Sequence, residues 1–141
     1  MKKWLFLLAV FGLVGNSYAV DTLWSKTTTH YTIYIDGGYA TMPFSPPTSV
    51  PISGTSVTLV SYQWAPYTNG RTIEFVELCY SQPYSSIIGY CQNISASQTG
   101  TTLNYNGFSA RGKFWIRHTL TGGTYPAFSS TTDTVTVNYH Y

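Results

Sequence analysis

The side chains of this sequence that could serve as nucleophiles or bases are three histidines and two cysteines: His30, His118, His140, Cys79 and Cys91. A catalytic nucleophile needs a base within hydrogen-bond reach and a third group that orients the base. Residues 107–111 begin like the turn that presents a nucleophilic serine, but the second glycine of that motif is missing. His30 and Asp36 share one expected strand, too far apart along it for contact. We therefore expect the histidines to be structural.

Paired carboxylates are the other arrangement that could act on a substrate, as they do in glycosidases. Glu74 and Glu77 are the nearest pair, and at this spacing on a strand their side chains point to opposite faces. Asp36, Glu74 and Asp133 could meet only through the fold. The cysteines have no partner ligands at zinc-finger spacing, and phosphate-binding and calcium-binding loop motifs are absent. We predict that the protein is not an enzyme and has no metal or cofactor.

The two cysteines are expected to form a disulfide. Cys79 and Cys91 both lie in the part of the chain that would be exported, and oxidising compartments favour disulfides. A loop of this length is stabilised by about 3 kcal/mol when it is closed, according to the chain-entropy model. The bond would tie together the ends of a Pro- and Ser-containing excursion between two strands.

Export is predicted from residues 1–19, which have the three zones of a secretory signal peptide. Two lysines precede an apolar run at residues 4–14, and Ser17 and Ala19 stand at the −3 and −1 positions of a cleavage site. The run is shorter than the roughly 20 residues that a membrane-spanning helix needs. We expect a periplasmic or secreted protein of a Gram-negative bacterium, without membrane insertion after cleavage, whose residues 20–141 form one domain.

Charge is sparse in the expected mature chain. The sequence has seven Lys+Arg and five Asp+Glu residues, for a formal net charge of +2. Two of the lysines leave with the signal peptide, so the mature chain has no formal net charge. Nucleic-acid binding requires a basic footprint, and we predict no nucleic-acid partner. Arg111, Lys113 and Arg117 crowd one expected strand, and we interpret this small patch as a solvated strand face.

The remaining residues favour an all-β fold. Thr, Val, Ile and aromatic residues dominate, turn signals recur about every ten residues, and no segment has the helical period. Asn69-Gly70 is typical of a hairpin turn, and the four prolines of 42–51 indicate an edge or a surface crossover. We predict a small immunoglobulin-like β-sandwich of about seven antiparallel strands with one disulfide. The expected strands are 28–36, 55–64, 71–79, 87–94, 101–105, 112–119 and 132–140.

Aromatic residues are unusually abundant, with 13 Tyr, 7 Phe and 4 Trp in the sequence. Most aromatic residues on strands belong to the core, but a domain of this size cannot bury all of them. Exposed Tyr and Trp side chains form contact surfaces for proteins or sugars. We predict that Tyr84, Tyr90, Trp115 and Trp64 contribute to a partner-binding surface.

The order of several segments resembles the FlhE family of flagellar proteins. Trp24 is followed by the Pro-rich middle, by Val57 to Trp64, by the two cysteines and by a C-terminal strand at 135–139. The other matching segments are 100–102, 106–110, 114–116 and 126–127. The resemblance implies a non-enzymatic periplasmic accessory of flagellar assembly. Its partners would be flagellar rod, filament or export components. It would either chaperone rod and filament parts, so that they do not assemble in the periplasm, or limit leakage through the export apparatus.

Two other functions remain open from the sequence. A fimbrial or surface adhesin-type protein would share the export signal, the Thr/Ser richness, the disulfide and the alternating C-terminal strand. Chaperone-assembled pilins also have a donor-strand extension at the mature N-terminus, for which residues 20–25 are too short. A carbohydrate-binding module would use exposed tryptophans such as Trp64 or Trp115. The identity of the partner, the binding face and the oligomeric state are not determined by the sequence.

Overall fold

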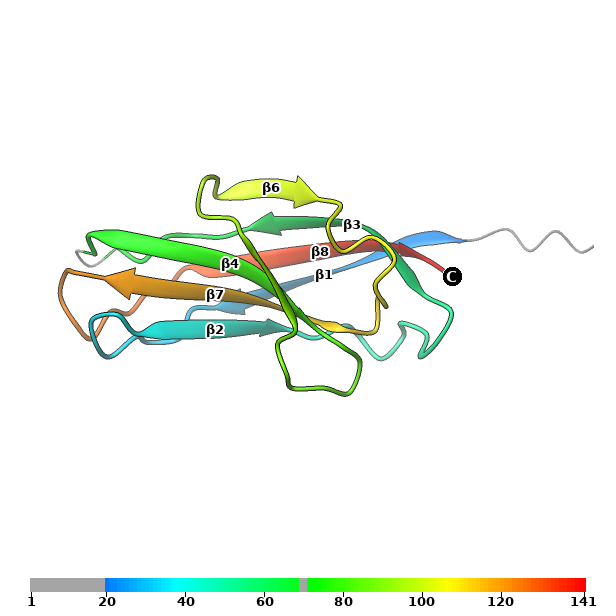
Figure 1. The fold of residues 1–141 in the computed structure, drawn as a ribbon, viewed down its shortest axis with the longest axis horizontal. Helices are drawn as coiled ribbons and strands as arrows, with labels where there is room; N and C mark the ends of the chain where they lie inside the picture. Colours follow the sequence, from blue (N-terminus) through cyan, green and yellow to red (C-terminus); the bar gives the residue numbers. More distant parts are fainter. Residues whose placement is uncertain (1–19, 69–70) are drawn as a thin grey trace, which may run out of the picture.

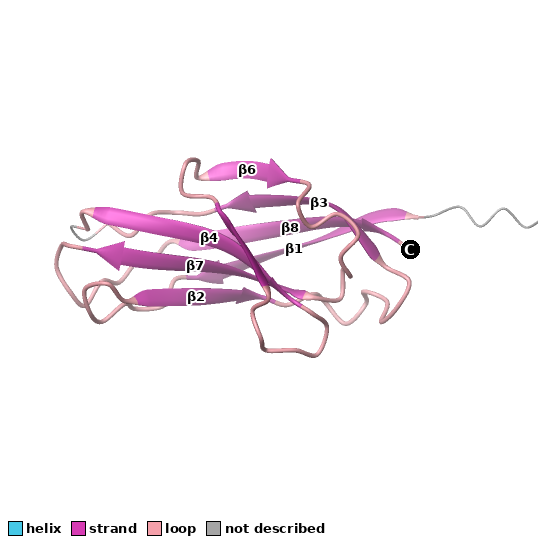
Figure 2. Cartoon of the chain, in the orientation of Figure 1, coloured by secondary structure: helices cyan, strands magenta, loops and turns pink. Residues whose placement is uncertain are grey.

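The computed structural model describes residues 20–68 and 71–141. The expected signal peptide, residues 1–19, lies outside this part of the chain. Strands and loops make up the described residues, with no helix among them (Figure 2). None of the described residues belongs to a helix that is long and apolar enough to cross a membrane. The predicted all-β class is confirmed.

Eight antiparallel strands form two sheets of four in the described residues, and the strands of both sheets run along the long axis of the molecule (Figure 1). We call the two sheets A and B. Sheet A has the order β1 (Asp21–Thr29), β8 (Thr132–His140), β3 (Ser56–Gln63) and β6 (Thr99–Thr102). Sheet B has the order β2 (Tyr39–Phe44), β7 (Lys113–Thr121), β4 (Ile73–Ser81) and β5 (Tyr90–Asn93).

Neighbouring strands in the sequence mostly lie in opposite sheets. Among the described strands, β4 and β5 are consecutive partners in one sheet, and every other connection crosses the sandwich. This order is that of an eight-stranded jelly roll. It differs from the immunoglobulin order, in which the first, second, fifth and fourth strands share a sheet. The hairpin expected at Asn69-Gly70 is wrong as a pairing, because β3 and β4 belong to different sheets; the turn itself lies outside the described residues.

The observed strand boundaries agree best with the predicted ones where apolar and polar residues alternate strictly. The strand predicted at 132–140 coincides with β8, and β3, β4 and β7 lie within two residues of their expected bounds. The strand predicted at 28–36 is wrong: β1 pairs with β8 from Asp21 to Thr29 and ends where β8 begins. Beyond it, Ile33 forms an isolated bridge to Ala127. The Pro-rich stretch contributes β2, an edge strand in which Pro43 lies opposite Trp115.

The core lies between the two sheets and is built from alternate residues of each strand. On β8 the buried positions include Val135 and Val137, and on β7 they include Phe114, Ile116 and Leu120. The hydroxyl groups of two tyrosines in this core are hydrogen-bonded to backbone carbonyl oxygens. The Tyr105 hydroxyl donates to Leu78 O at 2.6 Å, and the Tyr80 hydroxyl donates to Ser109 O at 3.0 Å. Such pairing lets the tyrosines fill the interior without leaving a buried polar atom unsatisfied.

The predicted disulfide is confirmed. Cys79 on β4 and Cys91 on β5 are direct register partners and are bonded to each other. Trp115 on β7 is the register partner of Cys79 on the other side. Because side chains of residues in register share a face, the disulfide and Trp115 lie side by side on the outer face of sheet B.

Candidate functional site

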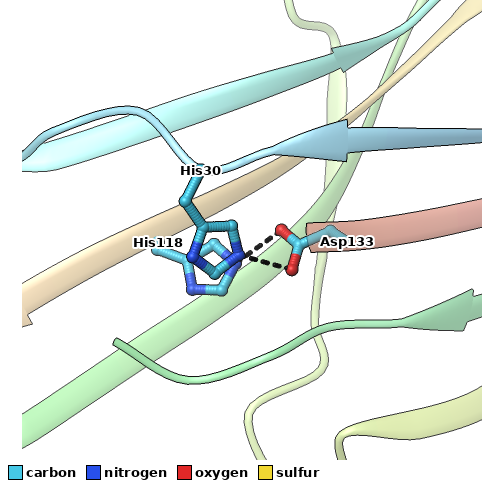
Figure 3. A group of neighbouring side chains, drawn as sticks. All are labelled: His30, His118 and Asp133. Atoms are coloured by element: carbon cyan, nitrogen blue, oxygen red, sulfur yellow. Dashed lines mark hydrogen bonds and ion pairs between the residues drawn. The ribbon is translucent and has the colours of Figure 1, made fainter. Parts of the chain in front are cut away.

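Four polar side chains meet between the sheets, and a fifth, partly exposed side chain contacts them. His118 comes from β7 and Glu74 from β4, both in sheet B, while Asp133 comes from β8 in sheet A. His30 follows the end of β1, and Arg71 precedes β4. Figure 3 shows both imidazole rings directed toward the Asp133 carboxylate. We call these five residues the histidine cluster.

Hydrogen bonds link the histidine cluster into one network. Asp133 Oδ1 is 2.7 Å from His30 Nε2, and Asp133 Oδ2 is 2.9 Å from His118 Nε2 (Figure 3). The opposite ring nitrogen, His118 Nδ1, lies 2.6 Å from Glu74 Oε1. Asp133 Oδ1 also accepts from the backbone N–H of Ala65 at 3.0 Å. The Arg71 guanidinium forms an ion pair with Glu74 Oε2.

The network sets the charges of its members. Burial by itself lowers the pKa of His118, but hydrogen bonds and the negative charges of Asp133 and Glu74 outweigh it and raise that pKa above its ordinary value. Burial by itself raises the pKa of Asp133, but hydrogen bonds from His118 and His30 outweigh it and lower that pKa. An imidazolium at His118 and a carboxylate at Asp133 thus stabilise each other across the two sheets.

The cluster is closed to a substrate. The side chains of His30, His118 and Asp133 have no exposed surface, so a reacting molecule could not reach them without an opening of the sandwich. Positive charges on His118 and Arg71 balance negative charges on Asp133 and Glu74. This balance is the condition under which buried charges are tolerated. The arrangement is therefore suited to holding the sheets together rather than to acid–base catalysis.

A divalent cation is the other occupant that this residue set would suit by type. One ligand atom each from His30, His118 and Asp133 lies within 4.8 Å of the others, and Glu74 behind His118 resembles the carboxylate that commonly orients a metal-bound histidine. In the structure, however, the ring nitrogens already bond to the carboxylate at hydrogen-bond distances. A cation would have to displace these protons and add charge to a cluster that is already balanced.

The sequence indicated parts of this cluster. On β7, His118 shares the buried face with Phe114 and Ile116, and the strict alternation of that strand allows this inward direction to be read from the sequence. Glu74 and Asp133 were expected to meet only through the fold, and both reach His118. Asp36 does not join them, because its Oδ1 accepts from Gly122 N at 2.7 Å in a turn. The contact of His30 with Asp133 was missed, because these residues are 103 positions apart.

The aromatic residues expected to bind a partner occupy different environments. Tyr84, in the loop after β4, is 81% exposed, and Tyr90 on β5 is 41% exposed with its ring packed against Tyr105 and Phe108. Trp115 is partly buried on the outer face of sheet B. Trp64 is 6% exposed and donates to Ser97 O at 2.8 Å, so it presents almost no surface to a partner.

Trp115 is held in place on its sheet face. Its Nε1–H donates to Ser81 Oγ at 2.8 Å, and Lys113 Nζ lies 4.8 Å from the centre of its ring. Further along the same face, Arg117 pairs with Glu77, with Nη2 2.6 Å from Oε2. Glu77 thus points outward and Glu74 inward, as their spacing predicted. Lys113, Trp115 and Arg117 share this outer face, because alternate residues of a strand point to the same side.

The fold and the cluster define the class of protein as a disulfide-bonded β-sandwich with jelly-roll strand order, whose sheets are joined by a buried ion network. Among solved structures, the crystal structure of FlhE is similar to this chain, with a TM-score of 0.67 and 23% sequence identity. The match covers 86% of this chain and 98% of the FlhE chain. The resemblance to FlhE drawn from the sequence is therefore confirmed at the level of the fold. Neither a protein-family model nor a curated protein matches the sequence.

Proposed function

We propose that this protein is a non-enzymatic periplasmic accessory of flagellar assembly or export, which works by binding flagellar rod, filament or export components. The observation that carries the proposal is the likeness in fold to FlhE, which extends over nearly the whole of that chain. The order of the cysteine pair, Trp24 and the C-terminal strand along the sequence supports the same assignment.

Binding rather than catalysis is supported by where the polar groups lie. The histidines and carboxylates with the strongest mutual contacts are sealed between the sheets. The side chains that solvent can reach include Tyr84 and, in part, Tyr90 and Trp115, which are residue types that dominate protein contact surfaces. The signal-like residues 1–19 and the disulfide support a location in an oxidising compartment outside the cytoplasm.

The proposal is tested in the motile strain that encodes the protein. We expect the full-length chain with a C-terminal tag to be recovered in the osmotic-shock fraction and to retain flagellar rod or filament subunits after cross-linking. Deletion of the gene should impair motility, and the wild-type chain should restore it. A triple variant, Tyr84→Ala, Tyr90→Ala and Trp115→Ala, should lose the cross-linked subunits and fail to restore motility.

The controls separate loss of contact from loss of fold. Tyr34→Ala is a matched control, because Tyr34 is 73% exposed in a loop of its own. The triple variant must keep the thermal midpoint of the wild type, since Tyr90 packs against core aromatic residues. Normal motility of the deletion strain, together with cross-links to fimbrial subunits or to a glycan, would contradict the flagellar assignment and favour one of the alternatives.

The chaperone and sealing roles predict different defects in the deletion strain. A chaperone of rod or filament subunits should leave polymerised subunits in the periplasm when it is removed. A protein that limits leakage should leave the periplasm free of polymers but increase the release of export substrates into the medium. Electron microscopy of periplasmic contents and immunoblots of the medium distinguish the two.

A further inference from the structure

Two cationic side chains, Arg111 just before β7 and Lys113 at its first position, have no acidic partner in the described part of the chain. Arg71 and Arg117 form ion pairs with Glu74 and Glu77. In the described part of the chain, Arg111 and Lys113 come within ion-pair distance of no carboxylate, and the same is true of Lys26 on β1 in the other sheet. In a chain with so few charges, two unpaired cations separated by the single residue Gly112 are a local excess of positive charge.

Arg111 and Lys113 line one pocket. Its volume is about 320 Å³, and its other lining residues are neutral: Pro46, Gln82, Tyr84, Ser85 and Ser86. The Arg111 guanidinium is fixed at the wall, because its Nη1 donates to Pro47 O at 2.8 Å and to Val50 O at 3.3 Å. A fixed guanidinium loses little side-chain entropy when it binds an oxyanion.

Aromatic groups flank the pocket. Tyr84 forms part of its wall and is almost fully exposed, and its φ of 61° is unusual for a residue other than glycine. A backbone held in this region is often found at binding sites. Lys113 connects the pocket to Trp115, since its ammonium group lies over the indole ring. Arg, Tyr and Trp are the residue types most enriched at the energetic centres of protein interfaces.

We propose that this pocket binds a carboxylate of an acidic segment on a protein partner. Arg111 and Lys113 supply the charge for the carboxylate, and Gln82 and the serines supply neutral hydrogen-bonding groups. Tyr84 in the wall and Trp115, which lies under the Lys113 ammonium group, supply apolar contact. The proposal rests on the proposed function and adds to it the chemistry of the partner. The flanking aromatics and the open, neutral wall favour a peptide over a free inorganic anion.

The probe is a capped tetraglutamate peptide titrated into ¹⁵N-labelled mature protein, with capped tetraglutamine as the uncharged comparison. We expect the tetraglutamate peptide to shift the Trp115 indole N–H signal and the backbone amides of 82–86 and 111–113. Lys113→Gln should weaken its binding about fivefold or more, as loss of a charged partner predicts. Lys113→Arg should retain binding. Lys26→Gln, which removes an unpaired cation from the opposite sheet, should leave it unchanged.

Several results would overturn the proposal. Equal binding of tetraglutamine, equal weakening by Lys26→Gln, or shifts located away from the pocket would each do so. Tighter binding of inorganic phosphate or glucuronate than of tetraglutamate would show an anion or glycan site instead. Cross-links to flagellar subunits that persist in Lys113→Gln would overturn this inference and leave the proposed function standing. Tetraglutamate binding that depends on Lys113, without any flagellar phenotype, would support this inference and overturn the proposed function.

Discussion

Replacement of Asp133 by Asn tests whether the histidine cluster stabilises the fold. The substitution keeps the shape of the side chain but removes its negative charge. Asp133 accepts hydrogen bonds from His30 and His118 on separate oxygens, and Ala65 N shares one of these oxygens. An asparagine can offer one acceptor oxygen, and its amide nitrogen then faces an N–H group of a histidine. His118 would be left as a buried imidazolium with Glu74 as its remaining anion.

The expected cost follows from the burial of the pair. Both Asp133 and His118 have side chains without exposed surface, and removal of one partner of such a pair typically costs about 3–5 kcal/mol. The whole free energy of unfolding of a domain is about 5–15 kcal/mol. We therefore expect Asp133→Asn to lose about a fifth or more of the free energy of unfolding and to lower Tm by about 10–20 °C.

The assay is equilibrium urea unfolding of the oxidised protein near pH 6, followed by tryptophan fluorescence. Glu77→Gln is the matched control, because it also removes a carboxylate paired with a cation on β7. That pair is partly exposed, with side-chain exposures of 31% for Arg117 and 18% for Glu77. Solvent screening limits its contribution to about 0.2–1 kcal/mol. The reasoning is refuted if Asp133→Asn costs no more than Glu77→Gln.

Three further predictions concern pH, the disulfide and a buried tyrosine. The raised pKa of His118 contributes stability that is complete below about 6.5 and is lost as the pH rises through the folded value; the lowered pKa of Asp133 contributes stability that is complete above about 3.8 and is lost as the pH falls through its folded value. Urea midpoints should therefore be highest between these limits, and a flat profile from pH 4 to 9 would contradict the assignment. Replacement of Cys79 and Cys91 by alanine should cost about 3 kcal/mol in urea unfolding, given their sequence separation of 12, and an unchanged midpoint would argue against the chain-entropy account. Tyr105→Phe should cost about 1–3 kcal/mol by calorimetry, because Leu78 O loses a buried donor; a neutral result would mean that another group satisfies it.

Local patterns in the sequence predicted the strands whose two faces differ most. The alternation of Val135 and Val137 with polar residues fixed both the bounds and the inward face of β8. Thr27 to Thr29 and most of the residues that follow them favour strands, so the local pattern could not show where β1 ends. Its end is set by pairing with β8, more than 100 residues away, and such long-range register is not encoded in local spacing.

The candidate site was only partly predictable for the same reason. The inward direction of His118 follows from the period of its own strand, but its partners come from three other segments. Asp133 lies on the opposite sheet, and the jelly-roll strand order brings its carboxylate into contact with His118 on β7. Likewise, the sequence showed Arg111 and Lys113 as part of a small basic patch. The pocket around them also needs the loop of Tyr84, and the path of that loop after β4 could not be predicted from local spacing.

The position of β8 has a consequence for how the molecule is made. This last strand of the chain lies in the interior of its sheet, where β1 and β3 both pair with it. A chain that emerges N-terminus first, from a ribosome or a translocation channel, holds two long unsatisfied backbone edges until the final segment is released. Sheet A is then completed late, when β8 pairs with both β1 and β3. Contacts between residues so far apart in the sequence make this step slow. Truncation of β8 would therefore remove an interior strand of sheet A rather than an edge strand.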